Sequence, residues 1–205
     1  MTLTPTDVRE YDEQTRAATE TATFALGCFW GPDAEFGAVD GVVRTRVGYA
    51  GGTKRDPSYH ALGDQTEALQ VDFDASVVSY TELLDHAFQL HDPHSQTRTT
   101  QYQNIVFAAT TSQRDALTTW LEANGFTADG VETRIERLSQ FHLAEDYHQK
   151  HSLRGENRLL NAFTEAGYDD TTIRESPAAA VVNAYAAGHE TDGLDLPDRQ
   201  TIRFR

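Results

Sequence analysis

Hydrophobic residues along the 205-residue chain follow two spacings. Short or alternating apolar runs predict strands, and apolar residues three to four positions apart predict amphipathic helices. Strands are expected over 21–27, 42–50, 67–74, 104–110 and 131–139. Helices are expected from Cys28 to about 40 and over 79–92, 112–125 and 156–166, with helical patterns also from 144 and over 177–188. Strands and helices therefore alternate through most of the chain.

This alternation predicts an α+β fold, a two-layer sandwich in which helices pack on a mixed sheet. Two strands follow each other directly in the middle of the series, so the order corresponds to a ferredoxin-like β-α-β-β-α-β core rather than a purely parallel sheet. We expect residues 1–20 to form a polar arm and 21–175 the main domain. Residues 176–205 are expected to form a helix and a tail, which packs on the domain or is partly mobile.

The charge is strongly acidic, with 32 Asp and Glu residues against 17 Lys and Arg and a net charge of −15. Such a surface repels phosphate, so no nucleic-acid partner is expected. The acids are scattered, which indicates a solvated surface of the kind found in salt-loving organisms, or an ordinary acidic protein. No apolar run reaches the roughly 20 residues that span a bilayer. We expect a cytoplasmic monomer.

The only cysteine, Cys28, is predicted at the junction between the first strand and the first helix. A helix N-terminus favours a thiolate, so we expect a lowered thiol pKa and a nucleophilic role. A buried, inert cysteine is the alternative, and it is the commoner case. Gly27 and Gly31 would leave room for a substrate beside the sulfur.

Seven motifs in order give the chain a resemblance to methionine sulfoxide reductases of type A, over residues 22 to about 155. The motifs are GCFWG (27–31), GYAGG (48–52), PSY (57–59), TEALQVDFD (66–74), HDP (91–93), QYQN (101–104) and AEDYHQK (144–150). The resemblance implies reduction of methionine S-sulfoxide and no metal or organic cofactor. It makes 21–175 the catalytic domain.

The same resemblance implies roles for named residues. The Cys28 thiolate would attack the sulfoxide sulfur, leaving a sulfenic acid on the enzyme. Glu67 would supply the proton to the oxygen, which requires a pKa raised by burial. Tyr59 and Tyr102 would hydrogen-bond that oxygen. The side chains at the substrate methyl group would be Phe29 and Trp30.

The chain departs from the family pattern at two places. An aspartate that binds substrate in many members is absent before Gln101, and Gln65 or Thr99 are the candidates to compensate. A second, resolving cysteine is also missing, so an external thiol must reduce the sulfenic acid. A small-molecule thiol or a thioredoxin- or glutaredoxin-like protein would serve as this partner.

Two histidine-containing stretches contain residues that can bind metals, His91-Asp92 with His94, and Asp146 with His148 and His151. Their spacings match no specific zinc or iron pattern, so structural hydrogen bonds are the preferred interpretation. Two other functions remain open for the thiol. One is a different thiol enzyme, such as a peroxidase or hydrolase. The other is a non-catalytic module that binds oxidised methionine.

Overall fold

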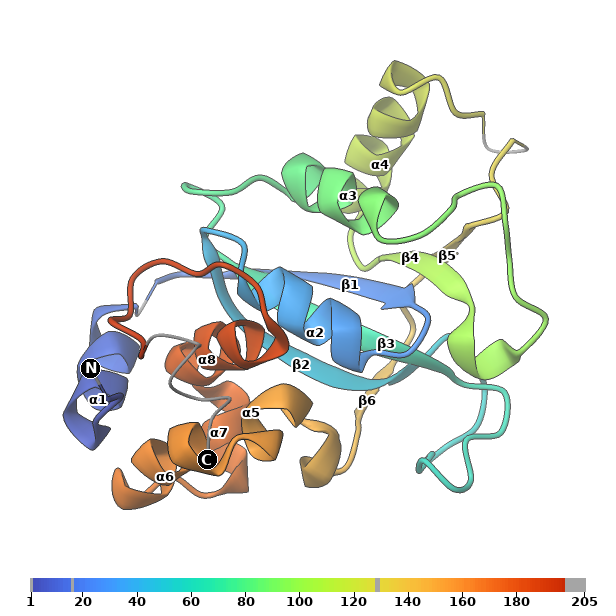
Figure 1. The fold of residues 1–205 in the computed structure, drawn as a ribbon. Helices are drawn as coiled ribbons and strands as arrows, with labels where there is room; N and C mark the ends of the chain where they lie inside the picture. Colours follow the sequence, from blue (N-terminus) through green and yellow to red (C-terminus); the bar gives the residue numbers. More distant parts are fainter. Residues whose placement is uncertain (1, 16, 128–129, 198–205) are drawn as a thin grey trace.

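A single mixed sheet organises the computed structural model, which describes residues 2–15, 17–127 and 130–197. Its six strands are β1 (Glu20–Leu26), β2 (Val42–Ala50), β3 (Thr66–Phe73), β4 (Asn104–Ala108), β5 (Arg134–Arg137) and β6 (Phe141–Leu143). The strand order is β5-β4-β1-β3-β2-β6. β4 and β5 run parallel, and the other neighbours run antiparallel. The predicted α+β fold with a mixed sheet is confirmed (Figure 1).

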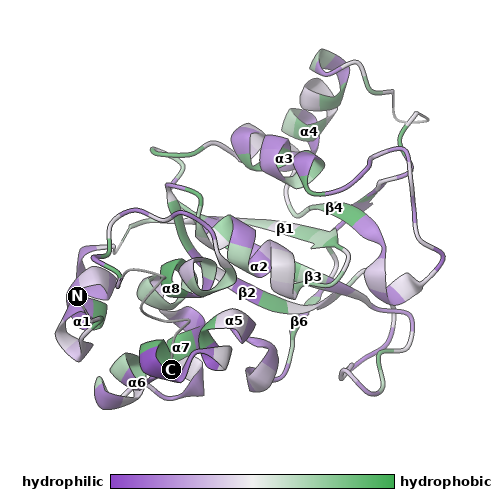
Figure 2. Cartoon of the chain, viewed as in Figure 1, coloured by the Kyte–Doolittle hydropathy of each residue, from purple (hydrophilic) through white to green (hydrophobic). Residues whose placement is uncertain are grey.

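The helices of the main domain cover one face of this sheet. They are α2 (Trp30–Gly37), α3 (Tyr80–Gln89) and α4 (Thr111–Ala123). On β3, Leu69, Val71 and Phe73 face these helices, while Ala68 faces the other way, as the alternation predicts. On the opposite face, Leu138 and Phe141, the first residue of β6, pack against a smaller apolar cluster. Figure 2 shows apolar colouring along the strands of the sheet and on the C-terminal helix α8 (Pro177–Ala187).

A second apolar cluster lies beside α2 and joins the two ends of the chain. It is built from α1 (Pro5–Gln14), α5 (His151–Gly155), α6 (Asn157–Glu165), α7 (Asp170–Glu175) and α8 (Pro177–Ala187). Figure 1 shows α1 against these C-terminal helices. Helix α1 lies within the segment expected to be a polar arm. It begins at a capping box formed by Thr4 and Asp7, and its apolar pattern is too weak to predict a helix. None of the helices in the described ranges is long and apolar enough to cross a membrane.

Two predicted helix starts were wrong by one or two residues. The helix expected from Cys28 begins at Trp30, because Gly27 has a φ of +75° and the chain bends before the first helical turn. The helix expected from 112 begins at Thr111, since the Thr110 side chain accepts the Gln113 N–H and caps it. Three short elements were missed altogether, namely β6, α7 and the 3₁₀ turn η1 (Thr100–Tyr102). A second 3₁₀ turn, η2 (Asp146–His148), falls within the helical pattern expected from 144.

Candidate active site

Cys28 lies in the bend between β1 and α2, and it is exposed. Burial of part of the residue raises the pKa of its thiol, the Trp30 backbone N–H lowers it, and the nearby Glu67 carboxyl raises it. The net effect is a raised pKa. The predicted lowering was therefore wrong for this state of the site. Cys28 precedes the helix instead of opening it, and a carboxyl lies close enough to oppose a thiolate.

Glu67 is fully enclosed where β3 begins, with 1% of its surface exposed. The Phe29 backbone N–H donates to its Oε2 at 3.1 Å, and Gln101 Nε2 donates to its Oε1 at 2.7 Å. Burial raises the pKa of Glu67, and these two bonds oppose that shift without cancelling it. The direction is the one a proton donor at neutral pH requires. The bond from Phe29 ties the carboxyl to the residue that follows Cys28.

The two tyrosines of the predicted site reach it from different segments. Tyr102 ends the turn η1, and Tyr59 lies in the long loop between β2 and β3. Burial first, and then the charges of Glu67, Tyr59 and Cys28, raise the pKa of Tyr102, which also hydrogen-bonds to Tyr59. The raised pKa favours the protonated, neutral form of the Tyr102 phenol. The structure brings these four predicted residues together.

Phe29 and Trp30 lie at different depths. Phe29 is buried to 1% exposure among the core residues, with its ring centroid 6.0 Å from that of Tyr49. Trp30 is half-buried, and its ring stacks on His151 with centroids 3.8 Å apart. Trp30 can therefore form an accessible wall beside the thiol, and Phe29 lies beneath it. Contact of either residue with a substrate methyl group stays a prediction.

Two supporting side chains escaped the sequence reasoning although they lie in quoted motifs. Glu145 accepts the Tyr59 backbone N–H at 2.9 Å through Oε1 and the Tyr49 hydroxyl at 2.7 Å through Oε2. Burial raises its pKa, but these bonds outweigh burial and the pKa is lowered. Glu145 is thus an anionic anchor for the loop that carries Tyr59. Gln101 is the second missed residue. It donates to Glu67, and it follows the place where the family's aspartate is absent.

The two candidates to compensate for that aspartate differ in placement. Gln65 is 2% exposed and is engaged at both ends, since its Oε1 accepts the Gly52 N–H and its Nε2 donates to the Lys54 carbonyl. It braces the loop through these two bonds, and a role toward the substrate stays a prediction. Thr99 is exposed at the start of η1, and its role stays a prediction.

The histidines considered as metal ligands have structural partners. His91 bonds the Ala87 carbonyl and the Thr133 hydroxyl, and His94 bonds the Gly130 carbonyl. His148 Nδ1 lies 3.2 Å from the indole nitrogen of Trp30. No group of three or more His, Cys, Asp or Glu that could hold a metal occurs within the parts of the chain that the structure describes.

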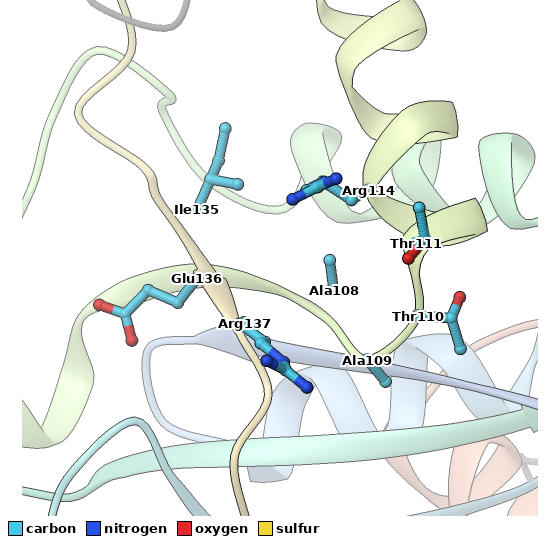
Figure 3. Close-up of a pocket in the computed structure, with 8 residues that line it drawn as sticks. All are labelled: Ala108, Ala109, Thr110, Thr111, Arg114, Ile135, Glu136 and Arg137. Atoms are coloured by element: carbon cyan, nitrogen blue, oxygen red, sulfur yellow. The ribbon is translucent and has the colours of Figure 1, made fainter.

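A surface cavity at the far end of β4 is separate from these residues. It is lined by Ala108, Ala109, Thr110, Thr111, Arg114, Ile135, Glu136 and Arg137. Figure 3 shows it between the start of α4 and the strand β5. Tyr102 precedes the opposite end of β4. None of the predicted site residues lines the cavity, so it offers no alternative location for the thiol chemistry.

Comparison with known proteins points to one family. Residues 20–178 match the family model described as "Peptide methionine sulfoxide reductase". A peptide methionine sulfoxide reductase of Drosophila melanogaster is 37% identical over 197 residues, covering 88% of this chain and 77% of that protein. One from Methanococcoides burtonii is 40% identical over 144 residues, covering 64% of this chain and 94% of that protein.

Solved structures give the same indication. Methionine sulfoxide reductase A of Corynebacterium diphtheriae superposes with a TM-score of 0.58 at 29% identity, covering 69% of this chain and 77% of that one. The reduced form of Mxr1 from Saccharomyces cerevisiae superposes with a TM-score of 0.54 at 28% identity, covering 75% and 90%.

Proposed function

Because the chain belongs to the peptide methionine sulfoxide reductase family, we propose that it reduces methionine S-sulfoxide, free or in proteins, to methionine with an external thiol. The observation that carries the proposal is the enclosed Glu67 carboxyl, bonded to the peptide N–H that follows Cys28. A sulfoxide oxygen is a poor leaving group until it is protonated. A carboxyl whose pKa is raised by burial, beside the cysteine sulfur, is suited to supply that proton.

The resting site holds the protons that the first step consumes. Burial raises the pKa of the Cys28 thiol and of the Glu67 carboxyl, which favours the protonated form of each group. As the Cys28 sulfur bonds to the sulfoxide sulfur and the S–O bond breaks, two protons convert the oxygen to water and a sulfur–sulfur bonded cation forms. Attack of water on the Cys28 sulfur releases methionine and leaves Cys28 as a sulfenic acid, whose hydroxyl keeps one hydrogen of the water while the other returns to Glu67 as a proton. Net, the oxygen moves from the substrate to Cys28.

Tyr59 and Tyr102 act as neutral donors to the oxygen during this step. Their hydroxyls lie within hydrogen-bond reach of each other next to Glu67 and Cys28, so an oxygen placed between them can accept from both in place of that bond. We assign the substrate methyl group to the wall made by Trp30, with Phe29 beneath it. This arrangement would put the sulfoxide sulfur against Cys28 and its oxygen toward Glu67.

The sulfenic acid is returned to the thiol by two external thiols. The first displaces water and forms a mixed disulfide with Cys28, and the second releases Cys28 and leaves as a disulfide with the first. The 205 residues contain no second cysteine that could take the first role. We therefore propose a thioredoxin- or glutaredoxin-like protein, or a small-molecule thiol, as the reductant. A lone cysteine also fits a reducing compartment, and we propose the cytoplasm.

We propose that residues 21–175 form the catalytic domain and that the flanking segments support it. The family model spans nearly the same range, residues 20–178. The described parts of 1–20 and 176–205 include α1 and α8, which meet in the second apolar cluster next to α2. Their apolar packing supports α2, the helix that follows Cys28.

The test is an assay of the two separated epimers of methionine sulfoxide with dithiothreitol as the reductant. We expect turnover of the S epimer alone, and loss of turnover in Cys28→Ser. Hydrogen peroxide and a thioester serve as competing substrates, so faster turnover of either would indicate a different thiol enzyme. Binding of the S epimer without one methionine formed per enzyme would indicate a binding module. Full activity in Cys28→Ser would overturn the proposal.

A further inference from the structure

His148 is a buried imidazole at the edge of the site that the steps above do not use. It ends η2 and has 2% of its surface exposed. Four aromatic rings surround it, those of Phe29, Trp30, Tyr59 and Tyr147, with centroids 5.2, 5.7, 4.7 and 4.2 Å from its own. Three of these rings belong to the proposed substrate site or its wall. The imidazole is thus packed where it can set their positions.

The one hydrogen bond of this ring defines its tautomer. Trp30 Nε1 lies 3.2 Å from His148 Nδ1, and an indole nitrogen can only donate. Nδ1 must therefore be an unprotonated acceptor, and the proton of the neutral ring is on Nε2. Burial lowers the pKa of His148, Glu145 raises it, and His151 and His60 lower it, with a net lowering. The neutral form that the bond requires is the form favoured near neutrality.

The backbone around His148 is fastened to the sheet. The next residue, Gln149, has a side chain that accepts the Val47 N–H at 3.0 Å and donates to the Val47 carbonyl at 2.8 Å. Lys150 is fully buried and donates to the Thr45 carbonyl at 2.6 Å. Two successive side chains thereby anchor the segment to β2. A ring carried on such a segment has little freedom to follow a moving partner.

Trp30 is less constrained than His148, because it lies at the first position of a short helix and is only half-buried. His151 stacks on one face of its ring, and His148 accepts from its edge. Stacking leaves a ring free to slide in its plane, whereas a hydrogen bond at the edge fixes its direction. The bond to His148 is what defines where the indole points.

We propose that His148 is a positioning residue for the reduction: by accepting the Trp30 indole N–H on its Nδ1, it fixes the wall that holds the substrate beside Cys28. The proposal rests on the proposed function for its effect on turnover. The bond contributes to the site before any substrate arrives. Its loss should therefore weaken binding of the ground state and of the transition state alike, which raises KM more than it lowers kcat.

Two substitutions separate this role from simple packing. His148→Leu removes the acceptor, whereas His148→Asn keeps an oxygen acceptor near the position of Nδ1. We expect KM for the S epimer to rise about tenfold in His148→Leu, the size of one neutral hydrogen bond. In His148→Asn most of that loss should be recovered. His91→Leu is the matched control, since it removes a half-buried, hydrogen-bonded histidine outside the site and should leave KM unchanged.

A double-mutant cycle with Trp30→Phe tests whether His148 acts through the indole. Phenylalanine keeps an aromatic wall but has no N–H, so His148→Leu should add little to the loss already caused by Trp30→Phe. Additive losses, or equal losses in the Leu and Asn variants, would overturn the proposal. Unchanged KM in His148→Leu would do so as well.

A measurement without turnover keeps the proposal testable if the proposed function fails. Trp30 and Trp120 are the two tryptophans of the chain. In a ¹⁵N-labelled Trp120→Phe background, a single indole N–H resonance reports on Trp30. We expect this resonance to move upfield in His148→Leu and to stay close to its original position in His148→Asn. A resonance that is the same in all three proteins would show that the bond does not exist in solution, whatever the assay of sulfoxide reduction gives.

Discussion

Replacing Glu67 by glutamine isolates the proton that the proposed reaction needs. Glutamine has nearly the same shape, and its amide oxygen can still accept the Phe29 N–H that now bonds Oε2 at 3.1 Å. Its nitrogen would face Gln101, whose amide must then turn to accept rather than donate. Because both contacts can be remade, we expect the free energy of unfolding to change by about 1 kcal/mol or less.

The effect on turnover should be far larger. General acid catalysis contributes about 10²- to 10⁴-fold, and Tyr59 and Tyr102 would still bind the oxygen in the variant. We therefore expect kcat/KM for the S epimer to fall about 10³-fold, roughly 4 kcal/mol of barrier. Urea denaturation followed by circular dichroism checks that folding is kept. Glu82→Gln, at the exposed N-terminal cap of α3, is the control for a generic loss of charge.

The pH dependence gives a second readout for the same residue. Burial raises the pKa of Glu67, and in the proposed mechanism the active form is the protonated one. The rate should be maintained below that raised pKa and fall as the pH rises through it, and Glu67→Gln should lose this dependence. A variant that keeps activity within tenfold of the original, or that keeps the same alkaline fall, would refute the assignment of Glu67 as the acid.

Further substitutions test the donors and the anchoring of the site. Tyr59→Phe and Tyr102→Phe should each lower kcat/KM by about ten- to a hundredfold. The double variant should lose less activity than the product of the two single losses, because the two hydroxyls share a bond. A fully multiplicative loss in initial-rate assays would argue against a shared oxygen site. Lys150→Met should lower the free energy of unfolding by about 3 kcal/mol, because it leaves Asp33 buried without its cation. Urea denaturation measures this loss, with Lys54→Met as the control; equal stability of the two variants would contradict it.

The sequence predicts the parts of this molecule whose signals are local. Alternation along 67–74 places Leu69 and Ala68 on opposite faces of the sheet, as found. Cys28, Glu67, Tyr59 and Tyr102 were identified through resemblance to a family, and the structure places them together. Sequence position alone does not predict that they lie together, because Tyr102 is 74 positions after Cys28 in the chain. The strand order of the sheet brings β1 next to β4 and so brings the two residues close.

The features that were missed depend on tertiary contacts. The direction of the Cys28 pKa follows from the position of Glu67 beside it, which no local pattern contains. Gln101 was read as part of a motif, but its role needs the geometry of η1 against β3. The short strand β6 has three residues, too few for a periodic signal, and it forms only because β2 offers it an edge.

The C-terminal helices also bear on the chemistry, through a buried polar network. Asp33 of α2 accepts from Lys150 at 3.3 Å, from Thr45 at 2.5 Å and from Asn183 of α8 at 3.0 Å. These bonds link the helix after Cys28 and the segment after His148 to one carboxylate. A buried charge is costly unless its partners are fixed, so each element restrains the others. The network thereby restrains the segment that carries His148 against α2, the helix that begins with Trp30.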